Sequence, residues 1–311
     1  MKKRILAITT LAFLLGASCV QANNGSDNGD GLSISSVLQK DNFRSVSKKQ
    51  FDASQVKSMD VRTVSADVDV MGDATDKATV EMLAKGPNNK SLSESEIKER
   101  LEKYYDITTE LNGSQLTVKV EFKTKHIGNN QGLRLRFILH TPSAADANIK
   151  SVSGDVELTR AGQVNISTTS GDIELGHLSG DAVTASVSGD IQVSSVGGSF
   201  SGSTTSGDIK AGKVGALMKA GSVSGDIQIV AGKLGQDVKM KTVSGDVDLK
   251  IKNNAGMDLH LNTLSGDMNL NGLGAINYST KSKRKVVAQV NGGGKELDIE
   301  TVSGDIHISQ S

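Results

Sequence analysis

The chain has 311 residues, with 35 basic and 35 acidic side chains and a formal net charge of zero. That balance argues against a nucleic-acid partner. Aromatic residues make up 3% of the chain and tryptophan is absent, which argues against a stacking platform for sugars.

The first 22 residues have the pattern of an export signal. Three cations at positions 2–4 precede a mostly apolar stretch, 5–17, and residues 20–22 (Val-Gln-Ala) form a cleavage site of the usual small-residue kind. The apolar stretch is too short to cross a bilayer. We therefore predict an exported protein of the periplasm or the cell surface.

Cys19 is the only cysteine, and it leaves two forms of export open. The segment 15–19 resembles a lipoprotein signal in which Cys19 is acylated, but Gly16 stands where an aliphatic residue is usual. We therefore favour cleavage after Ala22, which releases a chain without disulfide or thiol chemistry. The alternative is a lipid anchor at Cys19, which would be the chain's one attachment to a membrane. Residues 23–40 are predicted to be a flexible tether.

Residues 41–150 are predicted to form a β-rich cap that contains one helix, at 94–105. Ser93 and Glu96 form a capping box, and apolar side chains at helical spacing follow them. Alternating stretches predict strands at 78–84, 115–123 and 133–140. Because a stack of repeats needs an atypical terminal unit, we expect this region to cover one end of the array that follows.

Residues 151–311 repeat one short phrase: a hydroxyl residue, an apolar residue, Ser-Gly-Asp, then apolar, polar, apolar. The aspartates of its eight copies are Asp155, Asp172, Asp190, Asp208, Asp226, Asp246, Asp267 and Asp305. They are 17, 18, 18, 18, 20, 21 and 38 residues apart, and a period near 18 indicates a solenoid. Residues 63–70 are interpreted as a degenerate earlier copy, with Ala in place of Gly.

The alternation after each aspartate is typical of a strand with one buried face. Glycine tolerates the positive φ of a corner, and Ser and Asp hydrogen-bond local backbone groups there. Coils stacked about 4.8 Å apart align their apolar side chains into one core. The hydroxyl residues align too, and they either pass hydrogen bonds from coil to coil or fill a tight corner. The predicted fold is all-β: a single-chain parallel β-solenoid with two or more strands per coil and right-handed crossovers.

The stacked aspartates raise an electrostatic question, because like charges at that spacing repel. Either each carboxylate accepts backbone N–H groups, as in a turn-capping Asp, or cations lie between the carboxylates. The first interpretation is favoured and implies no metal. The second is a calcium-stabilised module, since Asp181 lies nine residues from both Asp172 and Asp190, the spacing of a calcium-binding half-coil.

The polar residue between the two apolar ones points outward in each copy. This outward column begins with Glu157, Glu174, Gln192, Lys210 and Gln228. Because these side chains repeat with the coil, we expect a ligand to contact them.

The 38-residue gap before Asp305 is predicted to contain one diverged copy, whose corner is the segment 282–285. Cations replace the acidic corner there: Lys281, Lys283, Arg284 and Lys285. The segment is either a solvated loop or a contact for anionic lipid headgroups or anionic polymers.

No pattern of catalytic residues emerges from the sequence, and the chain is predicted not to be an enzyme and to need no cofactor. The five histidines fit no metal-ligand spacing, and His307 occupies an outward repeat position. The glycine-rich segment 291–296 lacks the first Gly and the final Ser/Thr of a phosphate loop. A carbohydrate-active β-helix enzyme is the remaining alternative.

The serial Ser-Gly-Asp phrases, together with an extended N-terminal part, resemble a bacterial family of unknown function labelled "putative adhesin". The resemblance covers residues 50–311. It implies a repeat β-solenoid and brings no catalytic residues. The resulting hypothesis is a non-catalytic envelope protein that presents a rigid, repetitive surface for adhesion, its partner being an envelope protein or a polymer.

Overall fold

The computed structural model describes residues 42–125, 127–128, 130–253 and 256–310. The predicted export signal, Cys19 and the predicted tether lie outside these residues. Among the described residues, no helix is long and apolar enough to cross a membrane.

The described chain is almost entirely strand, which confirms the all-β prediction. It contains one α-helix, α2 (Glu94–Tyr104), and two short 3-10 helices, η1 (Ala53–Gln55) and η2 (Pro87–Asn89). The strands are β1 (Arg44–Asp52), β2 (Ser58–Met71), β3 (Lys77–Lys85), β4 (Tyr105–Asn112), β5 (Gln115–Phe122), β6 (Arg134–His140), β7 (Asp146–Ser153), β8 (Val156–Ala161), β9 (Val164–Ser170), β10 (Ile173–Leu178), β11 (Ala182–Ala185), β12 (Ile191–Ser203), β13 (Ile209–Gly221), β14 (Ile227–Lys241), β15 (Val247–Ile251), β16 (Met257–Ser265), β17 (Met268–Asn271), β18 (Ile276–Lys281), β19 (Lys285–Val290), β20 (Lys295–Ser303) and β21 (Ile306–Gln310).

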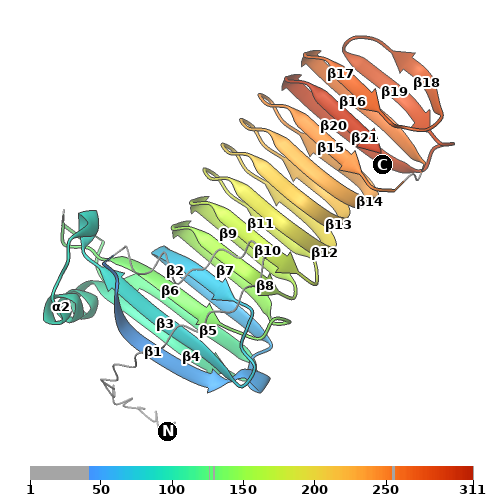
Figure 1. Ribbon diagram of the computed structural model, residues 1–311. Coiled ribbons are helices and arrows are strands. Elements are labelled where there is room, and N and C mark those ends of the chain that lie inside the picture. The colour runs from blue at the N-terminus through green and yellow to red at the C-terminus, as the bar shows by residue number, and fades with distance from the viewer. Residues whose placement is uncertain (1–41, 126, 129, 254–255, 311) are drawn as a thin grey trace, which may run out of the picture. The chain divides into compact units, whose positions relative to one another are not determined.

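Successive Ser-Gly-Asp copies stack as parallel coils in register. The strands that follow the corners pair side by side in the order β8, β10, β12, β13, β14 and β15, so that Val156, Ile173 and Ile191 align, and the later copies continue the row. Figure 1 shows these strands as consecutive rungs between the β2 end and the β17–β18 end. The fold is therefore solenoid-like, as the period near 18 predicts.

The coils also close laterally. Strands β2 and β12 are long, and the two halves of each pair with different strands: β2 with β7 and then β8, and β12 with β10 and then β11. Hydrogen-bonded ladders then run through β2, β7, β9, β11, β12, β10, β8 and back to β2, a closed ring of 7 parallel strands. The stack is thus closed like a barrel at this level, a feature that a periodic pattern does not predict.

The core is one continuous column of apolar side chains. Ile173, Ile191, Ile209 and Ile227 are all fully buried, as their place in the phrase predicts. The hydroxyl residues that open each phrase are buried as well. They fill the tight corner and also form hydrogen bonds between coils, the two roles that the sequence suggested. The Thr168 hydroxyl donates to the carbonyl oxygen of Gly171 in its own corner, at 3.1 Å, and is within hydrogen-bond distance of the Ser186 hydroxyl of the next coil, at 3.0 Å.

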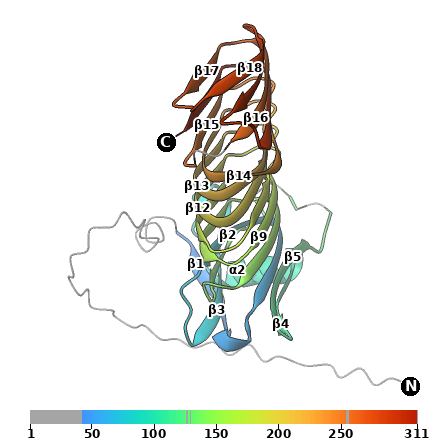
Figure 2. The same ribbon diagram turned by 90° about the vertical axis from the view of Figure 1, so that its right-hand side faces the viewer.

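The N-terminal region does more than cover the end of the stack. Its β2 includes the degenerate copy at 63–70 and forms the first coil, pairing in parallel with β7 and β8. Strand β7 crosses the boundary predicted between residues 150 and 151, and residues 41–311 form one compact unit. Helix α2 starts with the predicted capping box and ends one residue earlier than predicted. Figure 2 shows α2, β4 and β5 at the opposite end of the unit from β17 and β18.

The C-terminal coils do not stack in sequence order. Strand β20 lies between β14 and β16, and β21 lies between β15 and β17. The last coil of the chain is therefore inserted between the two coils that precede it. Its aspartate, Asp305, comes between Asp246 and Asp267 in the column.

The prediction of a diverged copy in the 38-residue gap is wrong. Residues 276–290 form an antiparallel hairpin of β18 and β19, which adds to the sheet beyond β16. The segment 282–285 is its turn, closed by the amide of Ser282 donating to the carbonyl oxygen of Lys285 at 2.9 Å. The segment has no Ser-Gly-Asp sequence, so it lacks the groups that continue a parallel corner, and the chain reverses instead.

Candidate functional site

Three surfaces of the stack carry candidate sites: the corner, the outward columns and the C-terminal outer face. At the corner, the aspartates form a hydrogen-bonded ladder. The Oδ1 atom of each aspartate accepts the backbone N–H of the aspartate in the next coil, at 2.7–3.3 Å. In order of stacking the ladder consists of Asp67, Asp155, Asp172, Asp190, Asp208, Asp226, Asp246, Asp305 and Asp267.

This ladder supplies the N–H donors that the turn-capping interpretation requires. Asp181 is held in a similar way on another side of the coil, where the amide of Ser199 donates to its Oδ1 at 2.7 Å and lowers its pKa. Among the described residues, no group of three or more His, Cys, Asp or Glu side chains has the arrangement of a metal site. The calcium-stabilised module stays a hypothesis that chelation can test.

A column of exposed apolar side chains runs beside the ladder. We call it the apolar corner column; it consists of Val152, Val187, Val223, Val243, Val302 and Leu264. Thr169 and Thr205 take the same place in two coils. This column is not among the predicted site residues, although the sequence contains the signal for it: strand alternation that buries the hydroxyl residue must expose its apolar neighbour.

The outward column is polar and points to solvent, as predicted. Its side chains differ in charge from coil to coil and do not form a uniform patch. Gln192, Lys210 and Gln228 are exposed side by side, and Lys210 pairs with Asp208 at 3.2 Å. Towards the N-terminal end the column becomes acidic, and burial followed by the nearby Glu174 charge raises the pKa of Glu157. His307 is exposed in this column beside Asp248, so it is a surface residue as predicted.

The acidic end of that column leads to a buried carboxylate. Asp69 is 5% exposed, and burial raises its pKa to about 6. Its Oδ2 lies 3.5 Å from Nε of Arg136, and neither of these two atoms has a hydrogen-bond partner among the described residues. Burial disfavours the charged form of Asp69 and the Arg136 charge offsets only part of that effect, so the pair affects the stability of the first coil.

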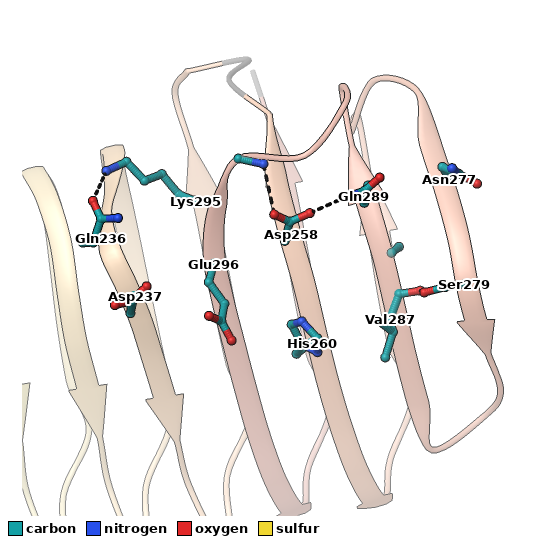
Figure 3. Close-up of a pocket in the computed structure, with 12 residues that line it drawn as sticks. Gln236, Asp237, Asp258, His260, Asn277, Ser279, Val287, Gln289, Lys295 and Glu296 are labelled. Atoms are coloured by element: carbon teal, nitrogen blue, oxygen red, sulfur yellow. Dashed lines mark hydrogen bonds between the residues drawn. The ribbon is translucent and has the colours of Figure 1, made fainter.

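The outer face at the C-terminal end contains a groove with a volume of about 560 Å³. Five strands line it: β14, β20, β16, β19 and β18. Its lining residues are Gln236, Asp237, Asp258, His260, Asn277, Ser279, Val287, Ala288, Gln289, Gly294, Lys295 and Glu296. Figure 3 shows the polar side chains of neighbouring strands projecting from the same face.

Strand register brings the groove's polar groups into rows. Asp258 on β16 lies opposite Glu296 on β20 and Gln289 on β19, and Asp237 continues the row on β14. The carboxylate of Asp258 is fixed, because its Oδ1 accepts from Nε2 of Gln289 at 3.1 Å and its Oδ2 accepts from the amide of Gly294 at 3.2 Å. Like charges directly opposite one another cost stability, so folding alone does not require this row.

Sequence features drew attention to only some of the residues that line this groove. The glycine-rich segment 291–296 was noted as a poor match to a phosphate loop, and the structure places it at one end of the groove, where Gly294 holds Asp258. His260 lines the groove near the middle of β16. No signal in the sequence unites these residues, because β14, β16, β19 and β20 meet only through the inserted last coil and the hairpin.

The cationic turn lies at the other end of the same strands. Lys281, Lys283, Arg284 and Lys285 are all exposed, and none of the four forms an ion pair with a described carboxylate. The ammonium group of Lys281 lies 4.5 Å from the ring centre of Tyr278. The turn and the groove are therefore separate surfaces of opposite charge.

A family of known sequences matches residues 56–309, nearly the whole described chain, and carries the description Toastrack DUF4097. The chain belongs to the Toastrack DUF4097 family. Membership agrees with the resemblance drawn from the Ser-Gly-Asp phrases and with an all-β, solenoid-like fold. No curated protein matches this Toastrack chain.

Solved structures of low identity are similar to this Toastrack chain. One is a "putative adhesin" from Bacteroides fragilis, with 13% identity, a TM-score of 0.46, and coverage of 84% of this chain and 96% of the other. Another is a "putative lipid binding protein" from Parabacteroides distasonis, with 15% identity, a TM-score of 0.44, and coverage of 85% and 96%. A third is a "putative cell adhesion protein" from Clostridium sporogenes, with 12% identity, a TM-score of 0.25, and coverage of 85% and 98%.

Proposed function

We propose that this Toastrack protein is an exported, non-catalytic envelope protein that binds a hydroxyl-rich polymer through the C-terminal groove. The observation that carries the proposal is the row of Asp237, Glu296, Asp258 and Gln289 across four neighbouring strands. Carboxylates accept hydrogen bonds, and amides both accept and donate them. A row of such groups matches the successive hydroxyl groups of a polysaccharide chain.

The groove is rigid, and this rigidity supports a role in ligand binding. Its side chains stand on strands, which hold positions more precisely than loops do. Asp258 is fixed by two hydrogen bonds and Lys295 by one, since its ammonium group donates to Oε1 of Gln236 at 2.7 Å. Preorganised groups lose little entropy when a ligand binds.

A binding role fits this groove better than hydrolysis. Catalysis by a carboxylate pair needs one group whose pKa is raised so that it donates a proton. The groove's carboxylates are Asp237, Asp258 and Glu296, and both oxygens of Asp258 already accept hydrogen bonds, from Gln289 and from Gly294. Binding without turnover is therefore proposed, and a polysaccharide incubated with the protein should keep its length.

The test is retention of the protein on immobilised polysaccharide prepared from bacterial envelope. The double variant D237K/E296K reverses two exposed charges of the groove and should lower retention at least about tenfold. The matched control Q192K/Q228K places two lysines on the outward column, at exposed positions that the groove does not include.

The two arms also decide between the groove and the outward column. If only Q192K/Q228K loses retention, the column predicted from sequence is the contact surface and the groove assignment fails. If neither variant changes retention, the groove is not the contact surface. If the parent protein is not retained, or if the polysaccharide is shortened during incubation, polymer binding without turnover is wrong.

A further inference from the structure

The cationic turn and the apolar corner column meet at the C-terminal end of the stack. The amide of Thr263 donates to the carbonyl oxygen of Arg284 at 3.0 Å, so Leu264 lies directly beside the turn. Leu264 is 59% exposed, and its neighbour in the next coil, Val302, is 45% exposed. Val243 continues the row, because the amide of Ser303 donates to its carbonyl oxygen.

We propose that this end of the protein docks on a membrane surface that contains anionic phospholipids. The cations of the turn would contact lipid phosphates, and Leu264 and Val302 would enter the boundary between headgroups and acyl chains. We call this surface the docking end; it consists of Lys281, Lys283, Arg284, Lys285, Leu264 and Val302.

Charge is the first reason for this assignment. The four cations are exposed and have no carboxylate partner among the described residues. Basic residues close to an anionic bilayer each add to binding, and the effect disappears within about one Debye length. The corner carboxylates of the two coils next to the turn are Asp267 and Asp305, and the second of these accepts the amide of the first. Glu300, which lies across Asn262 from Lys285, is ion-paired with Lys241. The four cations therefore outnumber the two corner carboxylates, and the charge of Glu300 is balanced by Lys241.

The exposed apolar side chains are the second reason, and they favour a membrane over a soluble polyanion. A polyanion would use the cations alone and leave Leu264 in water. A bilayer uses both, because interfacial binding combines buried apolar area with attraction to anionic lipids. The hairpin is what brings the two features together, since its turn stands where the next coil would otherwise continue the corner.

Acylation at Cys19, the alternative to cleavage after Ala22, would leave this surface a role in either form of export. With an anchor, the docking end would add a second attachment to the same membrane. Without one, it would give the released protein reversible attachment.

The test is flotation with vesicles of phosphatidylglycerol and phosphatidylcholine, compared with vesicles of phosphatidylcholine alone. The protein would begin at Asn23, which removes the leader and keeps every residue that the structure describes. We expect binding to the anionic vesicles only. The variant K283Q/R284Q should weaken it about 30-fold, at ~1 kcal/mol for each cation near an anionic surface. The variant D267N should strengthen it about fivefold for the same reason.

Two further variants separate the apolar contribution from the charge. L264S/V302S should weaken vesicle binding about tenfold and leave binding to soluble polyphosphate unchanged. The matched control K150Q/V152S changes a cation and an apolar corner residue, both exposed, in a coil far from the turn, and it should bind like the parent. Circular dichroism and thermal midpoints would confirm that all variants fold.

The outcomes that overturn the proposal are distinct. Equal binding to both vesicle types, or no loss with K283Q/R284Q, would show that the cations make no lipid contact. A loss with K283Q/R284Q but none with L264S/V302S would identify a general polyanion site. A loss with K150Q/V152S as large as with the docking-end variants would place the contact elsewhere on the corner.

Discussion

The backbone amide of Asp305 donates to Oδ1 of Asp246, 59 residues earlier in the chain, at 2.7 Å. Asp305 in turn accepts the amide of Asp267 at the same distance. The last coil therefore holds the preceding one in place from within the stack. The placement of residues 256–290 therefore depends on the final residues of the chain.

Removal of residues 295–311 should release the coil and the hairpin that precede them. Strand β17 pairs only with β21 among its described neighbours, and β16 reaches the rest of the stack through β20. Limited proteolysis should then cleave within 256–290 and spare 42–251, whereas the complete chain should resist. Protection of β16 in the shortened chain would mean that coils can stack in sequence order.

The aspartate ladder should depend on an acceptor oxygen more than on charge. In D190A the amide of Asp208 loses its acceptor, at a cost of about 1–3 kcal/mol in the free energy of unfolding. The matched variant D190N keeps an acceptor oxygen and relieves repulsion in the column, so it should cost less than about 1 kcal/mol. Denaturant titration measures both values, and equal losses would show that the carboxylate charge itself is required.

Chelation provides the test of the calcium-stabilised module. Because each ladder carboxylate already accepts a backbone N–H, we expect the thermal midpoint to stay unchanged when a calcium chelator is added. The same measurement on D190N serves as its control. A midpoint that falls with chelator in the parent and not in D190N would establish that cations lie along the ladder.

Gly207 illustrates how closely successive corners approach. Its φ is +150°, and a Cβ atom there would lie 2.3 Å from the carbonyl oxygen of Gly189. G207A should therefore destabilise the protein by at least about 2 kcal/mol. Gly221 is the matched control, because its added Cβ would meet only the carbonyl oxygen of Lys241, at 3.5 Å. G221A should be neutral or slightly stabilising, and equal effects of the two variants would contradict the close packing of the corner.

Stability should fall as the pH rises through the titration of Asp69. Its pKa is raised from 3.8 to about 6 in the folded protein, mainly by burial. Between these values the folded state binds a proton that the unfolded state lacks, so the contribution is present at low pH and is lost above about pH 6. The shift corresponds to at most about 3 kcal/mol.

Replacement of Asp69 should remove that pH dependence. D69N should raise the free energy of unfolding at pH 7 by about 1–3 kcal/mol and flatten its slope between pH 4 and pH 6. The exposed Asp248 is the control, and D248N should keep the parent's slope. A D69N protein less stable than the parent at pH 7 would show that the ion pair with Arg136 outweighs the cost of burial.

Local signals made the repeat region predictable. The alternation around Ile191 and Ile227 identified the buried face, and the same alternation in Ser-Val-Ser and Thr-Val-Ser exposes Val223 and Val243. The capping box at Ser93 located the helix to within a residue of its end. These features depend on neighbours in the chain, so they can be read without knowing the partners in space.

The sequence by itself determined the coil: its period, its corner, its buried face and the columns that stacking creates. Only the tertiary structure decided which coils are neighbours. Every Ser-Gly-Asp corner offers the same donor and the same acceptor to any other, so the ladder does not encode an order. The insertion of β20 and β21, the reversal at Ser282 and the packing against β14 settle that order. The groove and the docking end exist only because of those long-range choices.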